Sequence, residues 1–434
     1  MKNYRFLVPI VLIVALAASF YMLISNDAED HAQYNMYLEK ARSSAANGIT
    51  KAAIENYNKA KTIYDTIELD IEIAEYYKTH EKPREYMTCC EEIYKKYPKD
   101  VKAYEIMLTA YYNEKNYKSC FDVLEGAEKR RLSNEKIEEI SDAIKYEYQL
   151  DYNTYNTVRE YQYGYCAVKK EEYWGYVNRF GSQNTTAKYK NVNEYNGQGY
   201  APVTDKNGEV YFIDADGDKA TPTFEGAKQA GVLIDNRTAV QMGNEKYVYM
   251  NMEGKQLFDQ EFDYASAMNE SISAVKSGDK WRLFNAEGNS FGDEYDDVIL
   301  DESGIACRNK RLFVKQGDEY YLINESGNRV GELSFQDAKL FRGDCPTPVK
   351  IDDQWCFIDT NGNLISDKKY DDAMPFFFDL AGVCIDGKWG FVDKDENVVI
   401  EPQFFGTKCF NGKGSCFVNT GSAWQLLKLY RLNR

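Results

Sequence analysis

The stretch that decides the fold is "DGKWGFVDKDEN", residues 386–397, in which a Trp-Gly pair begins an apolar-polar alternation and an acidic cluster ends it. Alternation with a period of two residues is typical of a β-strand with one buried face. Asp393 and Asp395 stand two residues apart, as the ligands of calcium loops do. The stretch is therefore either a ligand site or one unit of a repeated scaffold, and the rest of the chain decides between them.

Related segments recur through the second half of the chain. They read "EYWGYVNRFG", "EVYFIDADG", "KYVYMNMEG", "KWRLFNAEG", "EYYLINESG" and "QWCFIDTNG". With the opening stretch, their leading positions stand 34 to 39 residues apart, at Trp174, Val210, Tyr247, Trp281, Tyr320, Trp355 and Trp389, and Trp424 continues the series. A fixed period of this length indicates a repeat fold.

The acidic residues hold a fixed place in each segment. An Asn or Asp follows the leading position by four residues, and a Gly follows three residues later except at Glu396. An Asx side chain at the start of a type I turn can accept from backbone amides, and Gly then adopts the left-handed conformation that closes a hairpin. The pattern predicts turns and no metal site, even at Asp214, Asp216 and Asp218, where carboxylates alternate.

Each unit also has a short strand before the leading position and an aromatic residue about fifteen residues after it, such as Phe262 or Tyr370. Three or four short strands in about 36 residues are typical of a propeller blade or of one coil of a β-solenoid. We therefore expect residues 156–434 to form an all-β, propeller-like closed ring of about seven blades, with an open β-solenoid as the alternative. In the closed form, the strand around Trp424 would complete the first blade.

These positions carry a resemblance to a known family. From about residue 161 to the C-terminus the chain resembles an array of WG repeats, a β-rich bacterial family named for the Trp-Gly pair that stands here as Trp174-Gly175 and Trp389-Gly390. The other repeat-defining tryptophans are Trp281, Trp355 and Trp424. The resemblance implies an architecture and brings no catalytic residue set.

Residues 31–155 lack strand alternation and are expected to be helical. Units of about 34 residues, beginning at Tyr34, Ile67 and Val101, place small residues such as Ala41 and Ala74 at equivalent positions. This part resembles the tetratricopeptide repeat, an α-solenoid in which small residues let antiparallel helices approach closely. Residues 133–149 open with a capping-box pattern and would form the terminal helix.

The N-terminus predicts a membrane anchor. Residues 6–24 carry no charge and are long enough to span a hydrocarbon core. Lys2 and Arg5 precede this segment and acidic residues follow it, so the positive-inside rule makes residues 1–30 a cytoplasmic tip and transmembrane helix, with all later residues outside the cytoplasm. The alternative is a signal peptide cleaved near residues 15–17, which would give a secreted protein.

Composition narrows the function. The net charge of −16 without a basic stripe argues against nucleic acid and anionic lipid headgroups as partners. Neither histidine, His31 or His80, has a nucleophile placed near it by a recognisable motif, so we expect no enzyme and no cofactor. The ten cysteines lack zinc-ligand spacing, and Cys90 and Cys120 form the pair to test for a disulfide.

The sequence thus predicts a membrane-anchored, non-catalytic scaffold that binds a protein or peptide partner in the groove of the helical repeats. An acidic and aromatic groove lining would suit a basic or amphipathic peptide. Two alternatives remain open: a carbohydrate or cell-wall binder, favoured by 36 tyrosines and by the run "PFFFD" at residues 375–379, and a hydrolase with paired carboxylates. The expected groove residues are Tyr37, Glu72, Glu75, Tyr76, Glu105 and Thr109.

Overall fold

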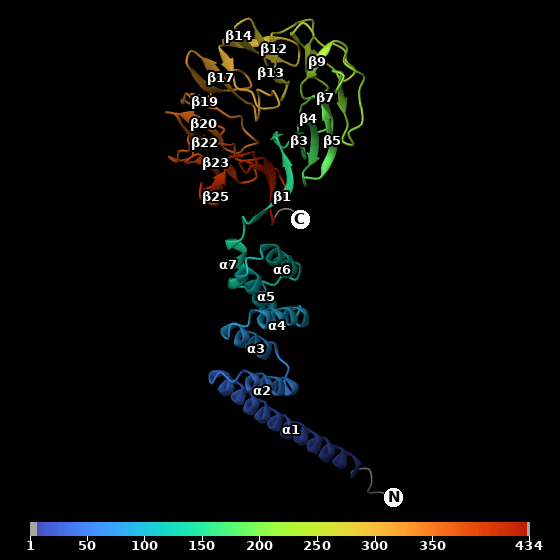
Figure 1. Ribbon diagram of the computed structural model, residues 1–434, viewed down its shortest axis with the longest axis vertical. Coiled ribbons are helices and arrows are strands. Elements are labelled where there is room, and N and C mark those ends of the chain that lie inside the picture. The colour runs from blue at the N-terminus through green and yellow to red at the C-terminus, as the bar shows by residue number, and fades with distance from the viewer. Residues whose placement is uncertain (1–6, 432–434) are drawn as a thin grey trace. The chain divides into compact units, whose positions relative to one another are not determined.

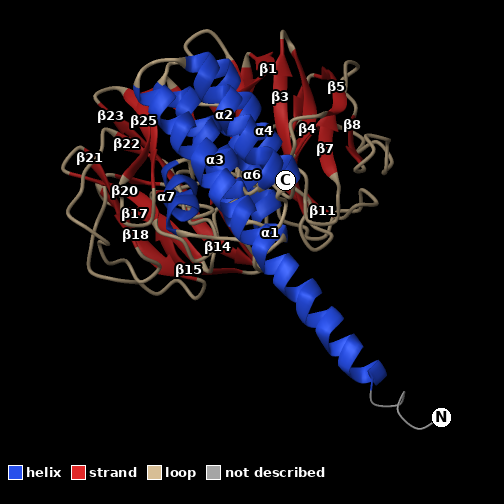
Figure 2. Ribbon diagram, turned by 90° about the horizontal axis from the view of Figure 1, so that it is seen from below, coloured by secondary structure: helices blue, strands red, loops and turns tan. Residues whose placement is uncertain are grey.

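The computed structural model describes residues 7–431, and the side chains among them from Asp27 onward. The chain forms two compact units that meet between Lys145 and Tyr146. In the described part, the helices belong to the first unit and the strands to the second (Figures 1 and 2). The predicted order of helices followed by β-structure is confirmed. The boundary falls before residue 155, where the sequence placed it, because residues 148–155 form a strand of the second unit.

The first unit consists of antiparallel helix pairs with small side chains between them. Ala41, Ala53 and Ala60 are fully buried in the first pair, and Cys90 and Cys120 are fully buried in the later ones. Small side chains let helix axes approach closely. The helices are α1 (Leu7–Ala46), α2 (Thr50–Ile63), α3 (Ile67–Thr79), α4 (Pro83–Lys96), α5 (Val101–Asn113), α6 (Tyr117–Lys129) and α7 (Glu135–Ala143).

The terminal helix α7 is present but shorter than predicted. Its N-cap is Asn134, whose side-chain oxygen accepts from the Ile137 amide at 3.0 Å. Ser133, the expected cap, instead donates to the Glu138 carboxylate. The helix ends at Ala143 because the chain then enters the first strand of the second unit.

The membrane helix predicted over residues 6–24 lies outside the residues whose side chains are described. From Asp27 onward, no helix combines the length and the apolar character needed to cross a membrane. The location of the two units outside the cytoplasm stays a prediction from the sequence.

In its described residues, the second unit is a ring of eight small antiparallel sheets that follow one another in chain order (Figure 1). The first four sheets are β2 (Thr157–Val158), β3 (Tyr165–Lys170), β4 (Tyr173–Asn178) and β5 (Gln183–Tyr189); β6 (Asn191–Val192), β7 (Ala201–Thr204) and β8 (Val210–Ile213); β9 (Ala227–Ala230), β10 (Thr238–Met242) and β11 (Tyr247–Met250); and β12 (Tyr264–Ala265), β13 (Ile272–Ser277), β14 (Lys280–Asn285) and β15 (Ser290–Tyr295).

The other four sheets complete the ring. They are β16 (Asp297–Val298), β17 (Arg311–Gln316) and β18 (Glu319–Asn324); β19 (Asp337–Ala338), β20 (Thr347–Ile351) and β21 (Gln354–Ile358); β22 (Asp372–Ala373), β23 (Ala381–Ile385), β24 (Lys388–Val392) and β25 (Val398–Phe404); and β26 (Gly406–Thr407), β27 (Ser415–Asn419) and β28 (Trp424–Leu429) with β1 (Tyr148–Tyr155).

The two ends of this unit meet in the eighth sheet. Strand β1 pairs antiparallel with β28, with Tyr148 opposite Leu429 and Tyr155 opposite Trp424. This corrects two predictions: the ring has eight sheets where about seven were expected, and the strand at Trp424 belongs to the last sheet and not to the first. The series of leading positions already included an eighth member, Trp424. Strand β1 covers the sheet edge that β28 would otherwise expose.

The Asx residues form the predicted turns. The Oδ1 atom of Asp393 accepts from the amides of Asp395 at 3.0 Å and Asn397 at 2.9 Å. Glu396, which replaces the usual Gly, adopts the same left-handed conformation with φ of 56°. The stretch that opened the sequence analysis is therefore a hairpin of the scaffold.

The leading aromatic residues pack between neighbouring sheets. Trp281 of the fourth sheet lies in a cluster with Val298 and Leu312 of the fifth, and Trp355 of the sixth lies with Val383 of the seventh. The core of the ring is thus divided among the sheet interfaces, which explains why the same residue types recur once per unit.

Candidate functional site

The first unit has a pocket of about 550 Å³ among α3, α4, α5 and α7, here called the α3–α5 pocket. Of the predicted groove residues, Glu75, Glu105 and Thr109 line it. Its lining includes the apolar side chains of Ile71 and Ile106. The complete lining is Glu68, Ile71, Glu75, Lys78, Tyr86, Lys102, Glu105, Ile106, Thr109 and Lys136.

The α3–α5 pocket carries lysines that the sequence reasoning missed. Lys78 pairs with Glu75 at 3.2 Å, and Lys102 pairs with Glu68 at 2.8 Å. The spacing could have revealed them, because residues three apart share a helix face, as Glu75 and Lys78 do. The lining therefore has both charge signs and is not the acidic surface that was expected.

Two carboxylates of the pocket remain suited to a partner. The Lys78 and Glu75 side chains are 41% and 45% exposed, so water screens their pair strongly. Glu105 accepts from the neutral amide of Asn134 at 2.7 Å. Neither carboxylate is held in a buried ion pair, and each can receive a cationic group.

The other predicted groove residues lie elsewhere and hold helices together. Glu72 accepts from Arg42 in two hydrogen bonds of 2.7 Å and from the Tyr57 hydroxyl at 3.0 Å. The Arg42 hydrogen bond keeps the pKa of Glu72 below its ordinary value. Tyr76 is buried, and Tyr37 is half-buried beneath the Lys59 ammonium, which lies 5.7 Å from its ring centre.

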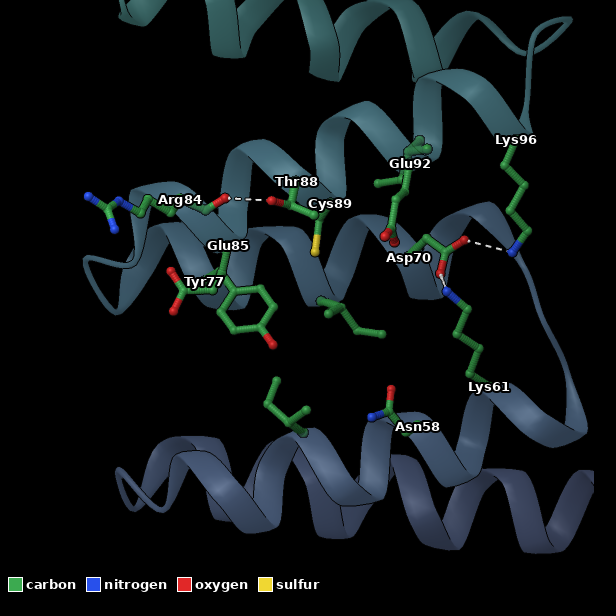
Figure 3. Close-up of a pocket in the computed structure, with 13 residues that line it drawn as sticks. Asn58, Lys61, Asp70, Tyr77, Arg84, Glu85, Thr88, Cys89, Glu92 and Lys96 are labelled. Carbon is green, nitrogen blue, oxygen red and sulfur yellow. Dashed lines mark hydrogen bonds and ion pairs between the residues drawn. The ribbon is translucent and has the colours of Figure 1, made fainter.

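A second pocket, of about 390 Å³, lies among α2, α3 and α4 (Figure 3). Asp70, 5% exposed, accepts there from Lys61 at 2.5 Å and from Lys96 at 3.0 Å. Burial alone would raise the pKa of Asp70, but these hydrogen bonds hold it below its ordinary value. Burial raises the pKa of the neighbouring Cys89 thiol to about 11, so this thiol is a poor nucleophile at neutral pH. The ion pairs in this pocket connect the helices, and its lining presents no reactive group.

The centre of the ring contains a cluster of buried charges. Both carboxylate oxygens of Glu160 accept from the Cys409 amide, at 3.2 and 3.0 Å, and Glu160 pairs with Arg342 at 3.3 Å. The loop of residues 301–304 reaches across the ring to this cluster, where Glu302 pairs with Lys408 and accepts from the Glu160 amide at 3.3 Å. Residues from the first, fifth, sixth and eighth sheets therefore meet at one point.

Glu194, beside this cluster, is the least satisfied of the central carboxyl groups. It is 3% exposed, and neither of its carboxylate oxygens has a hydrogen-bond partner in the described structure. Burial raises the pKa of Glu194 to about 8; Asp301 adds to the rise, and Arg159 and Arg342 oppose it. Glu194 is therefore mostly protonated at neutral pH.

The tryptophans and the three phenylalanines of the run at residues 375–379 are at least half-buried, whereas the exposed aromatic side chains of the described residues include Tyr152, Tyr163, Phe180 and Phe405. Trp281 and Trp355 are buried, and Trp174, Trp389 and Trp424 are half-buried. In the run "PFFFD", Phe376 is 2% exposed and its two following Phe neighbours are half-buried. The run at residues 375–379 thus no longer favours the carbohydrate alternative, which stays a prediction from the tyrosine content.

The described part of the chain shows no evident site for metal binding or for thiol chemistry. No group of three or more His, Cys, Asp or Glu residues there is arranged to hold a metal ion. The Oδ1 atom of Asp214 accepts from the amides of Asp216 and Asp218, both at 3.0 Å, as the predicted turn requires. All ten cysteines are free thiols, including Cys90 and Cys120.

Comparison with known proteins supports the repeat assignment in the second unit. The family described as WG containing repeat matches residues 174–209, 249–281, 355–389 and 389–418. These segments include the predicted Trp174, Trp281, Trp355 and Trp389. No curated protein matches the chain.

Several solved structures are similar to part of this chain. BamB from Moraxella catarrhalis is 12% identical and covers 64% of this chain and 93% of its own, with a TM-score of 0.41. KlHsv2 with loop 6CD replaced by a Gly-Ser linker is 9% identical, covers 56% and 96%, and has a TM-score of 0.38. A eukaryotic initiation factor is 12% identical, covers 59% and 78%, and has a TM-score of 0.40. At these values the likeness carries no argument about function.

Proposed function

We propose that this protein is a non-catalytic interaction protein that holds a peptide segment of a partner in the α3–α5 pocket. The observation that carries the proposal is that the pocket combines two apolar side chains with two carboxylates that are not in buried ion pairs. The apolar residues are Ile71 and Ile106, and the carboxylates belong to Glu75 and Glu105. Stacked helix pairs commonly bind peptides through such combinations of apolar and charged contacts. The expected ligand is a peptide with an apolar side chain against Ile71 and Ile106 and a Lys or Arg beside it.

The proposal predicts that reversing both carboxylates weakens peptide binding. Random peptides displayed on phage are selected against the full chain, and the affinities of the enriched peptides are measured by fluorescence anisotropy. For the double variant Glu75→Lys with Glu105→Lys, we expect binding to fall about tenfold or more, because two charge pairs of up to about 1 kcal/mol each become repulsions. Circular dichroism verifies that the variant is folded.

A matched double variant separates the pocket from general electrostatics. Glu91→Lys with Glu128→Lys makes the same change in net charge at exposed helix positions outside the pocket lining. This control should bind the selected peptides like the unmodified chain. Equal weakening in both double variants, or full binding in the first, would show that the α3–α5 pocket does not hold the peptide and that the helices serve as a spacer.

A further inference from the structure

A second cavity, in the ring, has the composition of a ligand site. This central pocket has a volume of about 290 Å³. Its wall combines the cations Arg308, Lys339, Arg342 and Lys408 with the carboxylates of Glu160, Asp301 and Glu302. Each cation has a carboxylate partner: Asp301 for Arg308, Asp372 for Lys339, Glu160 for Arg342 and Glu302 for Lys408. An anionic ligand can therefore bind a cation here by replacing one of these partners.

Most of the other lining residues are apolar. Leu340 is 5% exposed, and Ile299, Leu300, Met374 and Pro375 also line the same pocket. A pocket lined by apolar side chains and by cations fits a molecule with an apolar body and an anionic end. Charge complementarity therefore selects the class of ligand.

The Glu302 carboxylate already contacts one of these cations, the Lys408 ammonium. Its partner Lys408 has a side chain that is only 12% exposed, whereas the Glu302 side chain is 45% exposed. Glu160, in contrast, is fixed by two contacts with the Cys409 amide and by Arg342. Of the lining carboxylates, Glu302 is the most exposed, and turning it out to solvent would leave the Lys408 ammonium and the Glu160 amide, its other donor at 3.3 Å, to another anion.

We propose that the central pocket binds a carboxylate carried on an apolar body, and that the ligand carboxylate replaces the Glu302 side chain against Lys408. Glu302 then acts as an internal competitor that keeps the buried ammonium neutralised while the pocket is empty. The carboxylate can come from a small aliphatic acid or from the free C-terminus of a peptide that ends in an apolar residue, since both present the same chemistry.

The test uses hexanoate as the probe and hexanamide, its neutral analogue, as the control. Isothermal titration calorimetry with the full chain should show hexanoate binding and no hexanamide binding. The variant Glu302→Gln should bind hexanoate about fivefold more tightly, because a partly exposed ion pair no longer competes. The matched variant Glu253→Gln, on an exposed turn outside the pocket, should bind like the unmodified chain.

Further arms separate the sources and the sites. A hexapeptide ending in a free Leu carboxylate, compared with its C-terminal amide, shows whether a peptide C-terminus also enters. The variant Glu75→Lys with Glu105→Lys should leave hexanoate affinity unchanged, so failure of the proposed peptide site and failure of this one are distinguishable. The inference is overturned if hexanoate and hexanamide bind alike, or if Glu302→Gln fails to strengthen hexanoate binding.

Discussion

Replacing Glu194 by Gln should stabilise the ring at pH 8 by several kcal/mol while changing its stability little near pH 4. The folded ring keeps the proton on Glu194 up to about pH 8, whereas a glutamate in the unfolded chain loses its proton near its ordinary pKa of 4.5. Ionisation thus favours the unfolded chain, and the contribution of Glu194 to the stability of the unmodified ring falls as the pH rises from 4.5 to about 8. The full pKa difference corresponds to a free energy of about 5 kcal/mol.

The surroundings of Glu194 explain why this proton is retained. Asp301 and Glu302 oppose a further negative charge, and although Arg159 and Arg342 favour one, burial outweighs them. Gln has nearly the same shape and cannot ionise, so the variant avoids the cost at high pH. The gain should appear as a difference between variant and unmodified chain that grows between pH 5 and pH 8.

Urea unfolding followed by tryptophan fluorescence measures this difference. All five tryptophans lie in the ring, so the signal reports the ring alone. Glu253→Gln, at an exposed turn, serves as the control and should give no pH-dependent difference. A stability difference for Glu194→Gln that is the same at pH 5 and pH 8 would show that Glu194 is ionised in the folded ring.

The second large effect is expected at the Gly of the Trp-Gly pair. A Cβ atom at Gly390 would lie 2.4 Å from the Ile400 carbonyl oxygen and 2.7 Å from the Pro402 nitrogen. Both atoms belong to the backbone of β25, which bulges against β24 at this point. Backbone cannot rotate away as a side chain can, so Gly390→Ala should destabilise the ring by about 3 kcal/mol.

Gly412→Ala is the matched control, because a Cβ atom there would meet nothing within 4 Å. The melting temperature of the ring, followed by tryptophan fluorescence, should fall for Gly390→Ala and stay nearly constant for Gly412→Ala. Equal melting temperatures would mean that β25 does not cross Gly390 so closely. The same clash, with the Thr185 carbonyl oxygen at 2.7 Å, is expected at Gly175.

Local chemistry explains what the sequence predicted well. An Asx side chain binds amides two and four residues ahead, so the turns at Asp214 and Asp393 depend on a few neighbouring residues. The recurring tryptophans likewise fill the same interface once per sheet. These features repeat, and a repeated pattern can be read from one sequence.

The central cluster could not be predicted in the same way. Glu160 meets Cys409 across 249 residues of sequence, and Lys408 meets Glu302 across 106. The sequence did contain one indication of this cluster. Glu160 and Glu194 each lie two residues after the first short strand of their sheet, next to Arg159 and Asn193. Other units have small or apolar residues at this position, such as Ala267 and Leu300. Interpreting it requires the ring, since only closure places these positions around one centre.

Only part of the helical groove was predicted, again because contacts between residues far apart in the sequence are involved. The helix periodicity correctly placed Glu75 and Glu105 in the groove. Glu72 lies outside it because its carboxylate binds Arg42, which lies 30 residues away on α1. Side-chain pairing between helices depends on their crossing, which the periodicity of a single helix does not specify.

The central claim is that the second unit is a ring closed by the pairing of its first strand with its last. Hydrogen–deuterium exchange of the full chain tests this pairing directly. We predict that the β1 amides that point toward β28 exchange as slowly as those of β27, whereas the outward-pointing amides of this edge strand exchange fast. Fast exchange of every β1 amide, with β27 still protected, would contradict closure and leave the sheets as an open array.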